Sequence, residues 1–311
     1  MIGLIENTLV FFMYIINALL VLTFVFIQEK HIILAYMLIF FLQGTQDIDN
    51  TAQTSMLPEI VNKKDLVVAN STFDFIGNIT MLIGPGLGAI LYKYFGSSVL
   101  YILDSVSFLI AVFCIALIQY NYVKKTDMEI KFTLFQYAKE GFRQIKKNYF
   151  LIGILIVMMG HAILGRFYEI YKIYVVDYRL SMQVENIVYF NYAMAIGSLI
   201  TPFLTGGLGE RIKSWKAFSL VSILSICSLN VCGYASKMSI CFIMTVCFSI
   251  LNSFVGIAFR TIYQTEIENQ YLGRAMACYK IFTVLSAMVG IILAPVLLNL
   301  VGMSLAFTIT G

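Results

Sequence analysis

Long apolar runs, separated by short polar connectors, follow one another along the whole chain. A helix needs about 20 mainly apolar residues to cross a bilayer, and runs of that length recur throughout. The pattern predicts nine membrane-spanning helices and the start of a tenth near Met303. The nine predicted spans are 8–27, 32–54, 67–92, 98–120, 149–175, 187–208, 216–235, 238–260 and 276–299. We therefore expect an all-α, polytopic membrane protein.

The amino-acid composition also indicates a membrane protein. Hydrophobic residues make up 60% of the chain and charged residues 12%, against roughly 45–50% and 25% in soluble domains. The first apolar run lacks the basic start and the small-residue cleavage site of a signal peptide. The six cysteines lie in apolar stretches without metal-type spacing, so we expect no metal and no cofactor.

Basic residues divide the connectors into two sets. Fourteen of the 21 Lys and Arg residues lie in the connectors 60–66, 121–148, 209–216 and 260–275, and six lie in the alternate set. Connectors rich in Lys and Arg face the cytoplasm. This predicts a multi-pass protein of the cell membrane with a cytoplasmic N-terminus.

The longest connector, 121–148, combines aromatic residues at helical spacing with basic ones. Such a pattern is typical of an amphipathic helix on the anionic inner leaflet, and a solvated linker is the alternative. The connector divides the chain into an N-terminal bundle, 1–120, and a C-terminal bundle, 149–311.

Two segments on either side of this connector are alike, namely 53–88 and 264–298. Each opens with Gln-Thr at the end of a span, crosses a short charged connector and enters a helix that contains one proline. The likeness predicts two parallel repeats, as in transporters built from two halves.

Several stretches resemble one family of exporters in the major facilitator superfamily, which includes macrolide-efflux proteins and the enterobactin exporter. They are "LPEIVNKKDLVVANS", "IGPGLGAIL", "ILDSVSFLIA", "KEGFRQIKKNYFL" and "YLGRAMACYKI". The stretch "GGLGERIKSW" looks like a degenerate copy of the superfamily's loop motif, in which Gly206, Glu210 and Arg211 match. The resemblance implies a fold of two helical bundles.

The same alignment implies that the chain is truncated. Residue 1 falls where the family's third helix begins, and the twelfth helix is incomplete. Residues 1–120 would then hold family helices 3–6, and 149–311 would hold helices 7–11 and part of 12. A transporter with nine to ten spans and a non-functional remnant are the alternatives.

Polar residues inside the spans are the candidates for transport, because ionisable groups there are costly. Span 32–54 carries a stripe at helical spacing, formed by Gln43, Gln46, Asp47, Asn50 and Gln53; the next span begins with Asn70, Asp74 and Asn78. We expect the two stripes to meet, so that Asp47 or Asp74 binds a proton or a cationic substrate. The alternative is structural hydrogen bonding between helices. Asp49 lies off the stripe and is a weaker candidate.

Further candidates lie in the C-terminal half. His161 titrates near neutrality and could belong to the proton pathway. Arg166 and Glu169 have the spacing of an ion pair. Arg260 could form a gate pair with Glu266 or Glu268, or simply anchor its helix on the basic side.

The run "MLIGPGLGAIL" resembles the Gly-Pro-x-x-Gly motif of antiporters in this superfamily. Pro85 is expected to kink the helix, because it removes a backbone hydrogen bond. Gly77, Gly84 and Gly88 would form a small-residue face for close helix contact.

These features favour a secondary active exporter that exchanges protons for lipophilic or cationic small molecules of the drug or siderophore type. No Walker motif is present, and we expect a monomer in the lipid bilayer that is not an enzyme and binds no nucleic acid. The alternative from another class is an intramembrane prenyl or lipid transferase that uses "DIDN" (47–50) as its acidic motif.

Overall fold

A computed structural model describes residues 2–27, 31–117, 134–183, 186–207, 211 and 214–301. Three sequence predictions lie outside these residues: the structure of the connector over 121–133, the position of Glu210 and the tenth span. Within the described residues all regular structure is helical.

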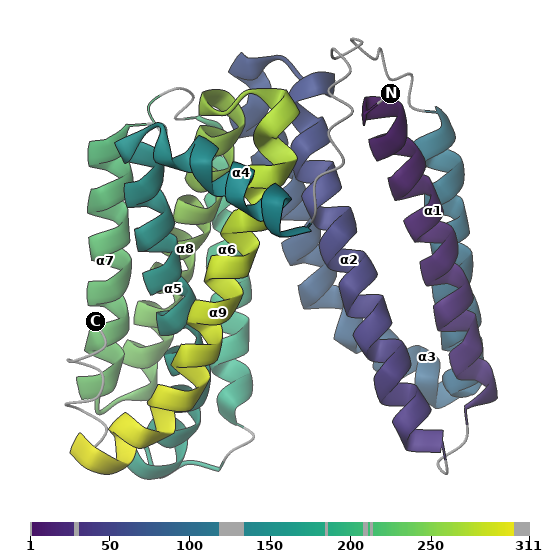
Figure 1. Ribbon diagram of the computed structural model, residues 1–311. Coiled ribbons are helices and arrows are strands. Elements are labelled where there is room, and N and C mark those ends of the chain that lie inside the picture. The colour runs from purple at the N-terminus through teal and green to yellow at the C-terminus, as the bar shows by residue number, and fades with distance from the viewer. Residues whose placement is uncertain are drawn as a thin grey trace. The chain divides into compact units, whose positions relative to one another are not determined.

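The apolar runs fold as predicted (Figure 1). The helices are α1 (Ile2–Thr23), α2 (Ile32–Ile60), α3 (Leu66–Leu117), α4 (Leu134–Lys146), α5 (Tyr149–Tyr174), α6 (Ile187–Gly206), α7 (Trp215–Tyr234), α8 (Met238–Glu266) and α9 (Asn269–Val301). Seven helical segments among the described residues are long and apolar enough to cross a membrane, and two shorter apolar ones lie in α1 and α7. The prediction of an all-α polytopic protein is confirmed.

Helix α3 contains two predicted spans in one element. The break between them is at Gly96, the one residue for which non-helical dihedral angles are recorded inside α3, with φ 74° and ψ 174°. This positive φ suits glycine, which has no Cβ to clash with the backbone. Gly96 therefore supplies the turn that the sequence predicted between residues 92 and 98.

The contacts between Cα atoms divide the chain into two units. Unit 1 comprises 1–60 and 83–132, and unit 2 comprises 61–82 and 133–311. The boundary inside α3 falls between Leu82 and Ile83, directly before Gly84. The first part of α3 thus belongs with the C-terminal helices, although it precedes the long connector in sequence.

In unit 1, α1 packs against α2. The second half of α3 is tied to α1 by the Ser105 hydroxyl, which donates to the carbonyl of Ala18 at 2.9 Å. The Phe24 and Tyr101 rings stack at 5.4 Å between centroids. The buried apolar cluster recorded in this unit contains Ala52 and Met56.

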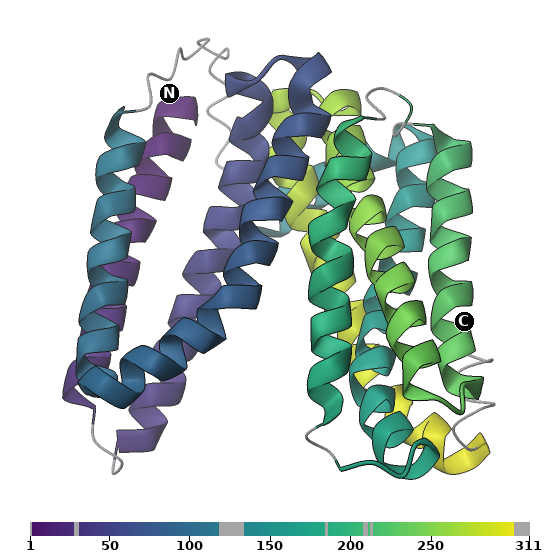
Figure 2. The ribbon, with the colours of Figure 1, turned by 180° about the vertical axis from the view of Figure 1, so that it is seen from behind.

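In unit 2, α6 and α7 both pack against α8, and α5 packs against α9. Figure 2 shows α6, α7 and α8 side by side from behind. Two large apolar clusters fill the unit: one surrounds Ile262 and Tyr263, and the other surrounds Tyr171 and Phe190. These four side chains are almost fully buried.

Helix α4 is amphipathic, as predicted, but its buried face packs on protein. A Cβ on Gly141 would clash with the carbonyl oxygen of Arg274 in α9, and Ile145 is fully buried. The Phe142 ring lies 5.7 Å from that of Phe282. The amphipathic pattern therefore reflects docking on α9, with the basic side chains outward, and the lipid leaflet is not needed to explain it.

Candidate functional site

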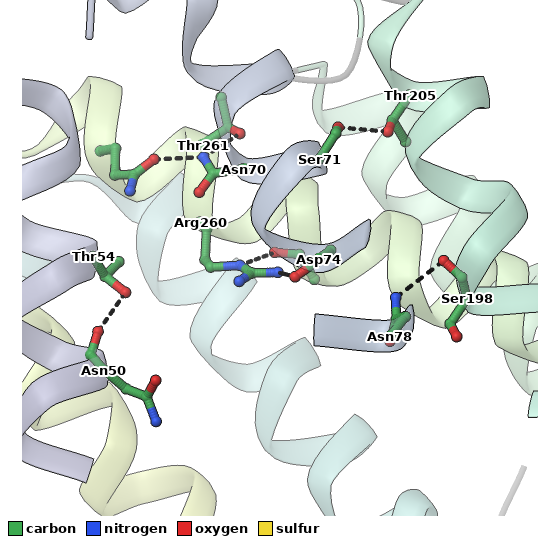
Figure 3. Close-up of polar contacts among 12 residues, drawn as sticks. Asn50, Thr54, Asn70, Ser71, Asp74, Asn78, Ser198, Thr205, Arg260 and Thr261 are labelled. Carbon is green, nitrogen blue, oxygen red and sulfur yellow. Dashed lines mark hydrogen bonds and ion pairs between the residues drawn. The ribbon is translucent and has the colours of Figure 1, made fainter. Parts of the chain in front are cut away.

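An ion pair inside unit 2 joins two residues that the sequence singled out separately. Nη2 of Arg260 in α8 donates to Oδ1 of Asp74 in α3 (Figure 3). The Asp74 side chain is 18% exposed and that of Arg260 28%. Both residues lie within segments apolar enough to span a membrane, where paired charges are far less costly than isolated ones.

Buried amides lie one helical turn away from this pair. Nδ2 of Asn70 donates to Oε1 of Gln264 at 2.6 Å and to Oγ1 of Thr261 at 3.1 Å. Asn70 is 2% exposed, and Gln264 and Thr261 are fully buried. Because the amide and the acid recur at i and i+4, one face of α3 presents both to α8.

The same segment is also bonded to α6. The Ser71 and Thr205 hydroxyls lie 2.8 Å apart, and Nδ2 of Asn78 donates to the carbonyl of Ser198 at 3.1 Å. Figure 3 shows these contacts beside the ion pair. Polar bonds thus hold the first part of α3 between α6 and α8, with Asp74 fixed toward Arg260.

The predicted gate partners of Arg260 are wrong. Glu266 accepts a hydrogen bond from Asn148 at 3.4 Å, and Glu268 accepts one from Gln270 at 2.7 Å. Both glutamates lie at or beyond the end of α8, whereas Arg260 lies more than one turn inside it. At this position in α8, Arg260 pairs with a carboxylate on another helix, Asp74 of α3.

Unit 1 holds a second buried acid, which is not one of the stripe residues. Asp49 is 8% exposed, and its Oδ2 accepts from Nε2 of Gln53 at 2.7 Å. Nε2 of Gln53 also lies 3.0 Å from the hydroxyl of Tyr14 in α1. The sequence placed Gln53 in the stripe and ranked Asp49 as a weaker candidate, because a pattern along α2 does not show that α1 contacts the face that carries Asp49.

The stripe itself is more open. Asp47 is half-buried and Asn50 is exposed. The carbonyl of Asn50 accepts from the Thr54 hydroxyl at 2.7 Å, as Figure 3 shows. Asp47 and Asp74 belong to different units, so the predicted meeting of the two stripes stays a prediction.

In α5, Nδ1 of His161 lies 3.1 Å from Oδ1 of Asn252 in α8. The predicted pairing of Arg166 with Glu169 is wrong, because Glu169 lies 2.7 Å from Nζ of Lys172. Lys172 lies three positions after Glu169, just as Arg166 lies three positions before it. Nζ of Lys172 also donates to Oδ1 of Asn191 at 3.1 Å.

The glycine run lies in continuous helix at residues 84–88. Within its own unit, a Cβ on Gly77, Gly84 or Gly88 would have no atom within 4 Å. The predicted small-residue contact is therefore not made there. Close approach occurs instead at Gly290, where a Cβ would lie 2.8 Å from the carbonyl oxygen of Ile163.

Comparison with known proteins agrees with this architecture. The family model described as Major Facilitator Superfamily matches residues 7–271. The chain belongs to the Major Facilitator Superfamily. It is 25% identical over 268 residues to the "Putative bacilysin exporter BacE" of Bacillus subtilis, covering 85% of this chain and 65% of the relative. The equally named protein of Bacillus amyloliquefaciens shows the same identity and coverage. The chain thus spans about two thirds of the length of these relatives.

The crystal structure of the human organic anion transporter MFSD10 (TETRAN) shares the fold. Its TM-score is 0.73 at 13% identity, over 99% of this chain and 80% of that one. At this identity the likeness concerns the fold alone.

In this superfamily member, the loop motif begins at the end of α6. Gly206 is the last residue of α6, and Arg211 is exposed, with its carbonyl accepting from the amide of Ser214 at 3.2 Å. Their role as a gate motif stays a prediction. Among the described residues, no cluster of three or more His, Cys, Asp or Glu side chains could hold a metal ion.

Proposed function

We propose that the protein is a secondary active exporter that exchanges protons for small lipophilic molecules by alternating access. Membership of the Major Facilitator Superfamily and relatives named as exporters support this proposal. In it, the protein is a monomer of the cell membrane with a cytoplasmic N-terminus, and bundles 1–120 and 149–311 are the moving parts.

The Asp74–Arg260 pair is the observation that carries the proposal. An acid and a base fixed to two different helices form a switch that a single proton can operate. Protonation of Asp74 removes one charge of the pair and leaves Arg260 without its counter-ion. The contact between α3 and α8 then weakens, and loss of the proton restores it.

The sequence also predicted cationic substrates, on the strength of Asp47 and Asp74. Since Asp74 is matched by Arg260, we assign it to proton coupling. Asp47, Asn50, Gln53, Asn78 and His161 remain proposed members of the substrate and proton pathway, and the run Gly84–Gly88 is the proposed antiporter motif.

The test uses everted membrane vesicles from a bacterial host that lacks its own multidrug exporters and expresses the 311-residue chain. Respiration acidifies the vesicle interior, and acridine orange reports proton release when ethidium, erythromycin or a catecholate siderophore is added. We expect proton release with at least one of these probes and none in Asp74→Asn. A protonophore should abolish probe accumulation.

Asp65→Asn is the matched control, because Asp65 is an exposed acid in the connector before α3 and should leave transport unchanged. Accumulation that persists with the protonophore would contradict proton coupling. A correctly inserted chain that moves neither probe nor proton would support the remnant alternative.

A further inference from the structure

A cavity of about 370 Å³ lies between α5 and α9 in unit 2. Its polar lining consists of His161 and Arg166 from α5 and of Lys280 and Thr283 from α9. The remaining lining is small or apolar, as at Gly165 and Ala287. Its volume falls within the range of small-molecule pockets.

The lining of this cavity is basic. Among the described residues that line it are an arginine, a lysine and a histidine, and none of them is a carboxylate. The nearest acid along α5, Glu169, is paired with Lys172. Nε2 of His161 is buried and makes no hydrogen bond within the described part of the chain. The described lining of the cavity therefore carries basic groups.

His161 lies deep in its predicted span. At about 1.5 Å per residue, it lies about 18 Å from the start of α5, near the middle of a hydrocarbon core about 30 Å thick. Lys280 lies about 6 Å inside the predicted span 276–299. Basic residues at such depth are costly and mark substrate or ion pathways.

The packing of α5 on α9 is tight at Cβ of Arg166. A Cβ on Gly290 would lie 3.1 Å from Cβ of Arg166 and 2.8 Å from the carbonyl oxygen of Ile163, so the helices cross there without spare room. At Gly165, by contrast, a Cβ would meet no atom within 4 Å. Cβ of Arg166 thus lies at a tight helix crossing, beside open space at Gly165, and the rest of the side chain is exposed.

We propose that this cavity binds the carboxylate of the exported molecule, through Arg166 and Lys280. The inference rests on the proposed export function and narrows its substrate class to small molecules that carry an anionic group. A planar guanidinium can bind a carboxylate through two parallel hydrogen bonds. The Lys280 ammonium adds a point charge from the facing helix, and the small apolar lining accommodates the rest of the molecule.

Binding can be measured without transport. The 311-residue chain is placed in phosphatidylcholine nanodiscs, and dansyl-glycine is titrated with its fluorescence as the readout, corrected with empty discs. Dansyl-glycinamide has the same ring system and no carboxylate. We expect dansyl-glycine to bind at least tenfold more tightly than the amide. Arg166→Gln and Lys280→Gln should each remove most of this preference.

Arg143→Gln and Lys139→Gln are the matched controls, because both side chains are exposed on α4 and lie outside the cavity. Gly165→Leu keeps every charge and fills open space, so it should fold normally and still weaken dansyl-glycine at least tenfold. Equal binding of acid and amide to the wild type, or full binding by Gly165→Leu, would overturn the proposal.

A lipid headgroup offers the same anionic chemistry. If dansyl-glycine binds in phosphatidylcholine discs but is displaced when phosphatidylglycerol is included, the lipid is the occupant and the small-molecule assignment is wrong. The outcome is separable from that of the export proposal. Binding of dansyl-glycine without proton-driven movement in vesicles would contradict export alone, and proton-coupled movement of neutral or cationic probes alone would contradict the carboxylate site alone.

Discussion

Two acids inside predicted spans, Asp74 of unit 2 and Asp49 of unit 1, are compensated differently. Asp74 in unit 2 faces the full positive charge of Arg260. Asp49 in unit 1 accepts from the neutral amide of Gln53, beside Tyr14. Removing the carboxylate of Asp74 leaves the charge of Arg260 without its partner, whereas removing the carboxylate of Asp49 leaves only the dipole of the Gln53 amide without an acceptor. The Asp74 site should therefore respond far more strongly to substitution.

The units also differ in packing. The two clusters of unit 2 bury large side chains such as Tyr171 and Tyr263. The cluster recorded in unit 1 consists of Ala52 and Met56, with Tyr14 and Ile115 against it. Substitutions that add side-chain volume should therefore lower the free energy of unfolding more in unit 2 than in unit 1.

The largest effect is expected from breaking the ion pair. Asp74→Asn or Arg260→Gln should each lower the free energy of unfolding by about 3 kcal/mol, the scale found when one partner of a buried pair is removed. The double variant strands no charge and should recover at least half of that loss. Unfolding of the purified chain in mixed micelles with increasing SDS measures all three; simple additivity of the two losses would show that the residues do not interact.

The next effect concerns packing. Gly290→Ala places a Cβ 2.8 Å from the carbonyl oxygen of Ile163 and should cost about 1–3 kcal/mol through overpacking. Gly88→Ala in unit 1 meets no atom within 4 Å; it should be neutral or slightly stabilising, because alanine is the better helix former by about 0.5–1 kcal/mol. The same micelle unfolding compares the two, and a costly Gly88→Ala would reveal a contact at the glycine run.

A smaller effect is expected at Asp49. Asp49→Asn removes the charge but keeps an acceptor for Gln53, and the free energy of unfolding should fall by about 1 kcal/mol or less. Tyr14→Phe should have a similar effect. If Asp49→Asn proved as damaging as Asp74→Asn, a cation would have to face Asp49 and the contrast between the two acids would disappear.

The smallest effect is expected on the outer face of α4. Arg143 is 75% exposed and lies 3.7 Å from Glu140, and such surface pairs contribute little. Arg143→Gln should change the free energy of unfolding by less than about 0.5 kcal/mol, whereas Gly141→Ala, which faces the Arg274 carbonyl, should cost several times more. Similar values for both variants would argue against docking of α4 on α9.

The helices could be predicted from sequence because each span is a continuous apolar run, and Gly96 was the one turn hidden inside a single element. The sequence predicted individual residues of the site but not which of them pair with one another. Asp74 and Arg260 are 186 positions apart, and spacing along one helix gives no information on partners in another.

The same limit explains the errors. Glu169 has a basic residue three positions away on each side, so spacing could not choose between Arg166 and Lys172. Asp49 lies on the face of α2 that becomes buried only when α1 packs against it. Both outcomes depend on neighbouring helices, which a pattern along one helix does not contain.

The sequence distance within the ion pair has a consequence for biosynthesis. Ribosomes add about 5–20 residues per second, so Asp74 leaves the ribosome about 10–40 s before Arg260, which is 186 residues later. During that interval the acid has no counter-ion from α8, and Asn70 also lacks Gln264. The first part of α3 must therefore wait in water, in the insertion machinery or with a proton on Asp74. It can pack stably in the bilayer only after α8 has been synthesised. Unit 2 therefore completes its packing late in translation, around a segment that was synthesised early.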